Sequence, residues 1–138
     1  MIILDTNVLS EEMKPVPAPE VHRWLLRQNA AELFTTAVCE AEILVGIAVL
    51  PAGRRKYDLE VAARSIFALF RGRILAFDSA AAAQYANIAA ARQRAGRPID
   101  GFDAQIASIA RLRGFVVATR DGSGFEGAGV TVINPWAV

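Results

Sequence analysis

Short apolar runs alternate along the whole chain with longer amphipathic stretches, and this alternation predicts strands and helices in turn. Runs rich in apolar and β-branched residues are typical of buried strands. They occupy residues 1–5, 32–36, 73–77, 115–119 and 130–134. Stretches of helical length and periodicity lie between them, at residues 20–28, 37–50, 59–70, 80–94 and 100–114.

Capping residues mark several of the predicted helix boundaries. Asp78 and Ser79 precede the alanine-rich helix and Gly96 follows it, while Asp100 and Gly114 bracket the next helix. Strands that alternate with helices pair in parallel through right-handed crossovers, and helices cover both faces of such a sheet. We therefore expect an α/β fold, a three-layer α/β/α sandwich with a mostly parallel central sheet, formed by one domain over residues 1–138.

Composition and charge narrow the classes of protein that this chain can belong to. Hydrophobic residues make up 54% of its 138 residues, which is enough for one core, yet no apolar run is long enough for a membrane span. Met1 is not followed by a basic segment, so we expect no signal peptide and a cytoplasmic location. The single cysteine, Cys39, is expected to be a small buried residue, and the net charge of +1 gives no global signal for nucleic-acid binding.

Two acidic residues come directly after predicted strands. Asp5 ends the opening segment "MIILDTN", and Asp121 follows "FVVAT" closely. The carboxyl ends of parallel strands meet at one edge of the sheet, where α/β proteins bind their ligands. Independent strands therefore deliver two carboxylates to the same edge.

Predicted helices supply two more acids. Glu40 and Glu42 project in nearly opposite directions from one helix, and we choose Glu42 as the inward residue because of the apolar run that follows it. Asp103 shares a helix face with Ala107 and Ala110, small residues that allow close packing against a sheet. A carboxylate beside that seam requires a partner.

Each acid also has an ordinary structural explanation. Asp100 fits a helix N-cap, and Asp103 fits a first-turn acid favoured by the helix dipole. Four carboxylates brought together, however, would repel one another unless a divalent cation neutralised them. Oxygen ligands without Cys or His suit Mg²⁺ or Mn²⁺, and such ions support phosphodiester hydrolysis without a nucleophilic side chain.

Five segments resemble one known family in the same order. They are "ILDTNVLSE", "AEILVGI", "GRPIDGFDAQIASIA", "ATRDGSGFEG" and "VINPW". Together they cover nearly the whole chain, and they are similar to the PIN domains, in particular to the VapC-like and FitB-like toxins of type II toxin-antitoxin modules. The resemblance implies a PIN-like fold and a Mg²⁺- or Mn²⁺-dependent ribonuclease. It also implies a homodimer and an inhibitory antitoxin partner.

The resemblance assigns roles to individual residues. The implied metal-binding and catalytic acids are Asp5, Glu42, Asp103 and Asp121. Supporting roles beside them are implied for Thr6, Asn7 and Thr119. Many relatives carry an acid immediately before the phenylalanine of the fourth segment, where this chain has Gly124, so Asp121 is the candidate from that loop.

RNA binding requires positive charge near these acids. The candidates are Arg94 and Arg97, before the helix of Asp103, and Arg120 beside Asp121. The basic run at residues 54–56 is interpreted as a solvated surface segment.

The remaining aromatic and histidine side chains are assigned no chemistry. Trp24 and Trp136 are interpreted as packing residues, and His22 has no visible catalytic partner.

Two other functions stay open from the residues alone. A phosphotransfer domain of the haloacid-dehalogenase type would use Asp5 as its nucleophile, but its pattern has a second Asp where this chain has Asn7. A non-catalytic interaction module could bind an ion through the same acids without cleaving RNA.

Overall fold

Five short strands and six α-helices follow one another in the computed structural model, which describes residues 1–138. The strands are β1 (Ile2–Leu4), β2 (Leu33–Thr36), β3 (Ile74–Leu75), β4 (Val116–Ala118) and β5 (Val132–Ile133). The helices are α1 (Thr6–Glu12), α2 (Pro19–Leu26), α3 (Ala37–Ala48), α4 (Arg54–Leu69), α5 (Ser79–Arg94) and α6 (Gly101–Arg113). Two 3₁₀ turns, η1 (Ala30–Glu32) and η2 (Gly122–Phe125), complete the chain.

The strands form one sheet in the order β3-β2-β1-β4-β5, and every neighbouring pair is parallel. Ile3 of β1 lies opposite Phe34 of β2 and Val117 of β4, so the first strand of the chain occupies the centre. The strand order reverses at β1, because the chain proceeds through β2 and β3 on one side before it returns to β4 on the other. Ligands of open α/β sheets bind at this kind of reversal.

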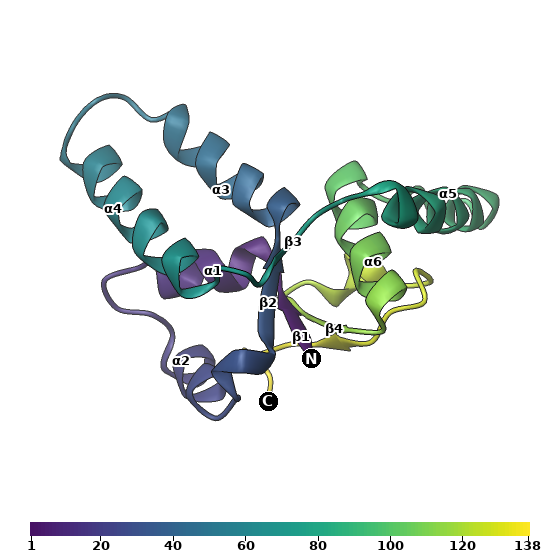
Figure 1. The fold of residues 1–138 in the computed structure, drawn as a ribbon, viewed down its shortest axis with the longest axis horizontal. Coiled ribbons are helices and arrows are strands. Elements are labelled where there is room, and N and C mark those ends of the chain that lie inside the picture. The colour runs from purple at the N-terminus through teal and green to yellow at the C-terminus, as the bar shows by residue number, and fades with distance from the viewer.

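Helices cover both sides of the sheet. In Figure 1, α1 to α4 lie on one side of the strands and α5 and α6 lie on the other. This arrangement confirms the predicted three-layer α/β/α architecture with a parallel sheet. No helix combines the length and the apolar run that crossing a bilayer would require.

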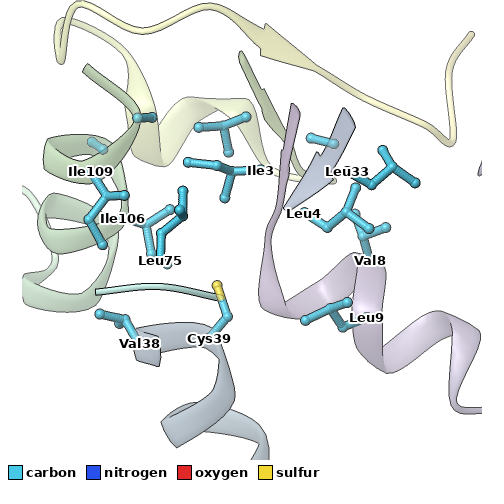
Figure 2. Close-up of a cluster of buried hydrophobic side chains, with 14 of the residues drawn as sticks. Ile3, Leu4, Val8, Leu9, Leu33, Val38, Cys39, Leu75, Ile106 and Ile109 are labelled. Atoms are coloured by element: carbon cyan, nitrogen blue, oxygen red, sulfur yellow. The ribbon is translucent and has the colours of Figure 1, made fainter. Parts of the chain in front are cut away.

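The core continues through both layers because successive side chains of β1 point to opposite faces. Figure 2 shows Ile3 directed toward Ile106 and Ile109 of α6, whereas Leu4 is directed toward Val8 of α1. All of these side chains are buried. Central burial on both faces holds the end of β1 rigidly at the edge of the sheet.

Helix α1 is the main difference from the predicted elements. The sequence predicts no helix between the strand at residues 1–5 and the helix at residues 20–28, but Asp5 caps a helix that begins at Thr6 and buries Val8 and Leu9. Because α1 starts directly after β1, its first polar residues are fixed at the edge of the sheet.

Helix α4 begins at Arg54 rather than at residue 59, so the basic run at residues 54–56 forms its first turn. Arg54 faces Asp58 one turn later, with Arg54 Nε 3.4 Å from Asp58 Oδ1, and both side chains are exposed. An exposed pair at this spacing supports the helix only weakly. Arg54 and Arg55 are exposed, as the sequence indicates, whereas Lys56 is half-buried and its Nζ donates to the carbonyl of Ala48 at 3.2 Å.

Candidate active site

A cavity of about 490 Å³ opens at the carboxyl ends of the central strands. Its walls come from the end of β1, from α1, α3 and α6, and from the segments that follow β4 and β5. The lining residues are Asp5, Thr6, Asn7, Ser10, Glu11, Lys14, Glu42, Asp103, Arg120 and Trp136. Three of the four acids expected from the sequence therefore share one cavity. A second cavity, of about 720 Å³ between α3 and α4, is lined mainly by apolar residues and contains none of those four acids.

Asp5 is buried at the junction of β1 and α1 and is held by three donors. Its Oδ1 accepts the backbone N–H of Thr6 at 2.7 Å, and its Oδ2 accepts the hydroxyl of Thr119 at 2.8 Å. The thiol of Cys39 approaches Oδ1 at 3.9 Å. Burial raises the pKa of Asp5, and the bonds from Thr119, Thr6 and Cys39 oppose that rise without cancelling it.

Glu42 reaches the cavity from α3. The hydroxyl of Thr6 donates to Glu42 Oε1 at 2.8 Å, which joins the acid of α3 to the first residue of α1. Burial raises the pKa of Glu42, the bond from Thr6 lowers it, and the charges of Asp5 and Asp100 raise it again. Glu40 instead lines the apolar cavity, so the choice of Glu42 over Glu40 agrees with the structure.

Asp103 lies in the first turn of α6, one turn after the N-cap Asp100. Burial and then the charges of Asp5, Asp100, Glu42 and Asp121 raise the pKa of Asp103 to about 6. Asp100 accepts the backbone N–H groups of Phe102 and Asp103, so it is the helix cap that the sequence predicts. It nevertheless adds negative charge close to the cavity.

Gly124 approaches Asp103 from the loop after β4. A Cβ at this position would lie 2.7 Å from Asp103 Oδ2, which is closer than side-chain atoms normally come. The loop is held there by the buried Arg92, whose guanidinium donates to the carbonyls of Gly124 at 3.2 Å and Glu126 at 2.7 Å. The glycine that departs from the family pattern therefore lies beside the acid of α6.

Asp121 does not line the cavity. Its side chain caps η2, where Oδ1 accepts the backbone N–H of Ser123 at 3.1 Å and the hydroxyl of Ser123 at 2.5 Å. It contributes the last of the charges that raise the pKa of Asp103. The structure thus places Asp121 near the other acids but directs its carboxylate to its own turn.

Asn7 and Thr119, two of the three predicted supporting residues, connect the strand ends to each other. Asn7 Nδ2 donates to Thr119 Oγ1 at 3.0 Å, and Asn7 Oδ1 accepts the backbone N–H of Arg120 at 3.2 Å. Thr119 in turn donates to Asp5, so a chain of hydrogen bonds links α1, β4 and the buried acid. Thr6 is the third supporting residue, through its bond to Glu42.

The basic residues expected from the sequence separate into two groups. Arg120 lines the cavity. Arg94 and Arg97 do not, and Arg97 is paired with Glu126 through an Nη2 to Oε2 distance of 2.8 Å. His22 is exposed, contacts Glu12 at 3.1 Å and does not line the cavity. Trp24 is buried, as predicted, whereas Trp136 both packs against the core and lines the cavity.

Sequence reasoning missed part of the cavity wall. The missed residues are Ser10 and Glu11 of α1 and Lys14 just after it. These positions follow the spacing of a single helix face, so recognition of α1 would have identified them together.

The carboxylates form an all-oxygen donor set, but they are not drawn into a compact group. No three His, Cys, Asp or Glu side chains lie close enough together to hold one ion as they stand. The charge of Asp5 nevertheless raises the pKa of Glu42, and the charges of Asp5 and Glu42 raise that of Asp103. Such mutual repulsion is what a divalent cation relieves.

Comparison with known proteins supports the family that the sequence resembles. The sequence profile of the PIN-domain family matches residues 2–128 of the chain. The chain is 42% identical to the toxin FitB of Neisseria gonorrhoeae, over 99% of both chains. It is 40% identical to the VapC ribonuclease Y4jK of Sinorhizobium fredii, over 99% of this chain and 98% of that protein. A crystal structure of FitAcB from Neisseria gonorrhoeae superposes with a TM-score of 0.93 at 40% identity, with both chains fully covered. The chain therefore belongs to the PIN-domain family, among its VapC-like and FitB-like members.

Proposed function

We propose that this protein is a Mg²⁺- or Mn²⁺-dependent endoribonuclease and the toxin of a type II toxin-antitoxin pair. The observation that carries the proposal is the convergence of Asp5, Glu42 and Asp103 from three elements on one cavity. Relatives that cover almost the whole chain at 40% identity or more are named as a VapC ribonuclease and a toxin. The chemistry of the cavity and the names of the relatives support the same activity.

The donor set fits a hard divalent cation. Asp5, Glu42 and Asp103 supply carboxylate oxygens, and no histidine lines the cavity. The thiol of Cys39 does not supply a competing thiolate, because burial and the charge of Asp5 raise its pKa to about 11. Asp121 is the fourth candidate, and its Oδ1 is held by the η2 cap. When bound, the ion supplies an activated water and stabilises the charge of the phosphodiester transition state.

The protein's own contribution is to position these acids. Thr119 and the backbone of Thr6 fix the two oxygens of Asp5, and the hydroxyl of Thr6 fixes Glu42. Without a cation, burial and the neighbouring carboxylates raise the pKa of Asp103 to about 6, so a cation bound beside it would favour its charged form. Arg120 places positive charge in the same cavity, where it can contact an RNA phosphate.

The partners in this proposal are RNA, an antitoxin protein and a second copy of the chain, all in the cytoplasm. The antitoxin and the homodimer follow from the resemblance to type II toxins, and the name of the FitB relative supports the toxin role. An antitoxin that covers this cavity would block the approach of RNA to the acids. Release of the antitoxin would then restore cleavage.

The test compares two acids on the same helix. Purified protein is incubated with total RNA in Mg²⁺, in Mn²⁺ and in EDTA, alongside the variants Glu42→Gln and Glu40→Gln. We expect cleavage with either metal, none in EDTA, a large loss in Glu42→Gln and parental activity in Glu40→Gln, because only Glu42 lines the cavity of the acids. Metal binding without cleavage of any RNA would favour the non-catalytic interaction module instead.

A further inference from the structure

The cavity of the acids also contains two cationic side chains. Lys14 and Arg120 are the lysine and the arginine among its lining residues. A cavity lined by carboxylates repels the phosphates of RNA, so a substrate chain that enters it requires positive charge within reach. Arg120 was predicted from the sequence, whereas Lys14, which lies just after helix α1, was not.

Lys14 is held by a buried carboxylate. Its Nζ lies 3.0 Å from Glu11 Oε1, and the other oxygen of Glu11 accepts the backbone N–H of Ala18 at 3.1 Å. The side chain of Glu11 is only 7% exposed, whereas that of Lys14 is 59% exposed. Glu11 is therefore an anchor inside the wall, while the ammonium group stands at its rim with donors left for another anion.

Arg120 is fixed by its backbone and by its ring contact. Its N–H donates to Asn7 Oδ1, and its carbonyl accepts Asn134 Nδ2 at 3.3 Å. The guanidinium lies over the ring of Trp136 at 5.1 Å from the ring centre, which occupies one face of the guanidinium. The N–H edge, which donates to phosphate oxygens in bidentate geometry, is not used by this stacking contact.

The two cations belong to one local charge arrangement. Burial acts to raise the pKa of Glu11, but the bonds from Lys14 and Ala18, together with the charges of Lys14 and Arg120, bring it below its ordinary value. Arg120 is thus close enough to Glu11 to act on it. The C-terminal segment is joined to Arg120 through Asn134, which accepts the N–H of Trp136 at 2.9 Å and donates to the carbonyl of Arg120.

We propose that Lys14 and Arg120 form a phosphate-binding site for the RNA chain at the rim of the cavity, with Glu11 and Trp136 as positioning residues. This inference rests on the proposed ribonuclease function and adds the residues that bind its substrate. Glu11 keeps the ammonium of Lys14 at the cavity, and Trp136 keeps the guanidinium of Arg120 there.

The test measures RNA binding apart from cleavage. The full chain is titrated in EDTA against a fluorescent single-stranded RNA of random sequence, and anisotropy gives Kd as a function of salt. Loss of one phosphate contact lowers the slope of log K against log salt by about 0.7 and weakens low-salt binding roughly five- to tenfold. We expect this change in Lys14→Gln and in Arg120→Gln, and we expect Lys14→Arg to restore the slope.

Matched controls come from basic residues outside the cavity. Lys56→Gln and Arg23→Gln remove the same charges from α4 and α2 and should leave Kd within twofold of the parent. A loss in the controls equal to that in Lys14→Gln and Arg120→Gln would overturn the proposed site, because net charge alone would then explain binding.

Double-mutant cycles test the positioning residues. Glu11→Asp keeps the charge but shortens the reach toward Lys14, and Trp136→Leu removes the ring under Arg120. Each should weaken RNA binding in the parent and have little further effect in Lys14→Gln or Arg120→Gln, respectively. Additive losses would show that Glu11 and Trp136 act elsewhere.

Cleavage assays with Mg²⁺ distinguish a failure of the phosphate-binding site from a failure of the proposed ribonuclease function. Cleavage by the parent, with unchanged binding and cleavage in Lys14→Gln and Arg120→Gln, would overturn the phosphate site and leave the nuclease intact. RNA binding that depends on Lys14 and Arg120 without any cleavage would support the site and overturn the ribonuclease. Absence of both binding and cleavage in the parent would overturn both.

Discussion

The hydroxyl of Thr119 donates to Asp5 Oδ2 at 2.8 Å. Thr119 directly follows β4 and Asp5 directly follows β1, so a residue at the end of one strand fixes the carboxylate at the end of its neighbour. The two strands are neighbours in register, with Leu4 opposite Ala118. A bond between adjacent strand ends orients a carboxylate without relying on a flexible loop. It also stabilises the charged form of Asp5, which burial disfavours.

Thr119→Val should impair cleavage by changing the protonation of Asp5. Valine has nearly the same shape, but it removes a donor that opposes the effect of burial, so the pKa of Asp5 rises further. We expect kcat/KM to fall by about tenfold near neutral pH and the acid limb of its pH profile to move to higher pH. The matched control is Thr35→Val, whose buried hydroxyl donates to the carbonyl of Leu4 at 3.0 Å. Equal profiles for the two variants would contradict this role of Thr119.

Asp103→Asn should stabilise the metal-free fold. The folded-state pKa of about 6 lies above the unfolded value, so ionised Asp103 costs stability fully above pH 6, and the cost disappears as the pH falls below the unfolded pKa. We expect thermal unfolding in EDTA to show a gain of about 1 to 2 kcal/mol at pH 8 that vanishes near pH 4. A gain that is independent of pH would point to packing rather than to charge.

Gly124→Ala should reduce cleavage with little effect on stability. The new Cβ would meet Asp103 Oδ2 at 2.7 Å, and the flexible end of that side chain can rotate away at small cost. The backbone angle at Gly124 is not in the left-handed region, so alanine causes no strain there. Activity assays and thermal melts should therefore separate, with a loss of cleavage and a change of at most about 0.5 kcal/mol in stability. Gly46→Ala, whose Cβ has open space, is the control.

Glu11→Gln should destabilise the protein near neutral pH. The pKa of Glu11 is lowered in the folded state, so its carboxylate contributes stability above the unfolded pKa, and this contribution is lost as the pH falls through the folded value. Chemical denaturation should show a loss of about 1 kcal/mol at pH 7 that narrows below pH 4. The exposed Glu32→Gln should show neither the loss nor its pH dependence.

The strands and helices with long apolar patterns could be predicted from the sequence. The apolar run of β4 and the periodic apolar positions of α6, for example, are typical of a parallel sheet that helices cover on both faces. Helix α1 was missed because seven residues with only two buried apolar positions, Val8 and Leu9, carry little periodic signal next to a strand. The cavity residues Glu11 and Lys14 were missed with it.

Positions at strand ends were easier to predict than side-chain directions. Asp5 lies where the strand pattern places it, because β1 is buried on both faces and ends at a cap. Asp121 also follows its strand, but the conformation of the next turn directs its carboxylate to Ser123. Trp136 was interpreted as packing alone, since nothing in the sequence near the C-terminus shows that Arg120 lies over its ring.

The proposed metal-dependent mechanism is tested most directly by the rate of RNA cleavage by Asp5→Asn and by the parent over a titration of Mg²⁺. Asparagine keeps the shape of the side chain and removes the charge that a cation requires. We expect cleavage by the parent that rises with Mg²⁺ and is abolished by EDTA, and a loss of at least about a hundredfold in Asp5→Asn, equivalent to roughly 3 kcal/mol of transition-state stabilisation. Equal, metal-independent cleavage by the two proteins would contradict this mechanism.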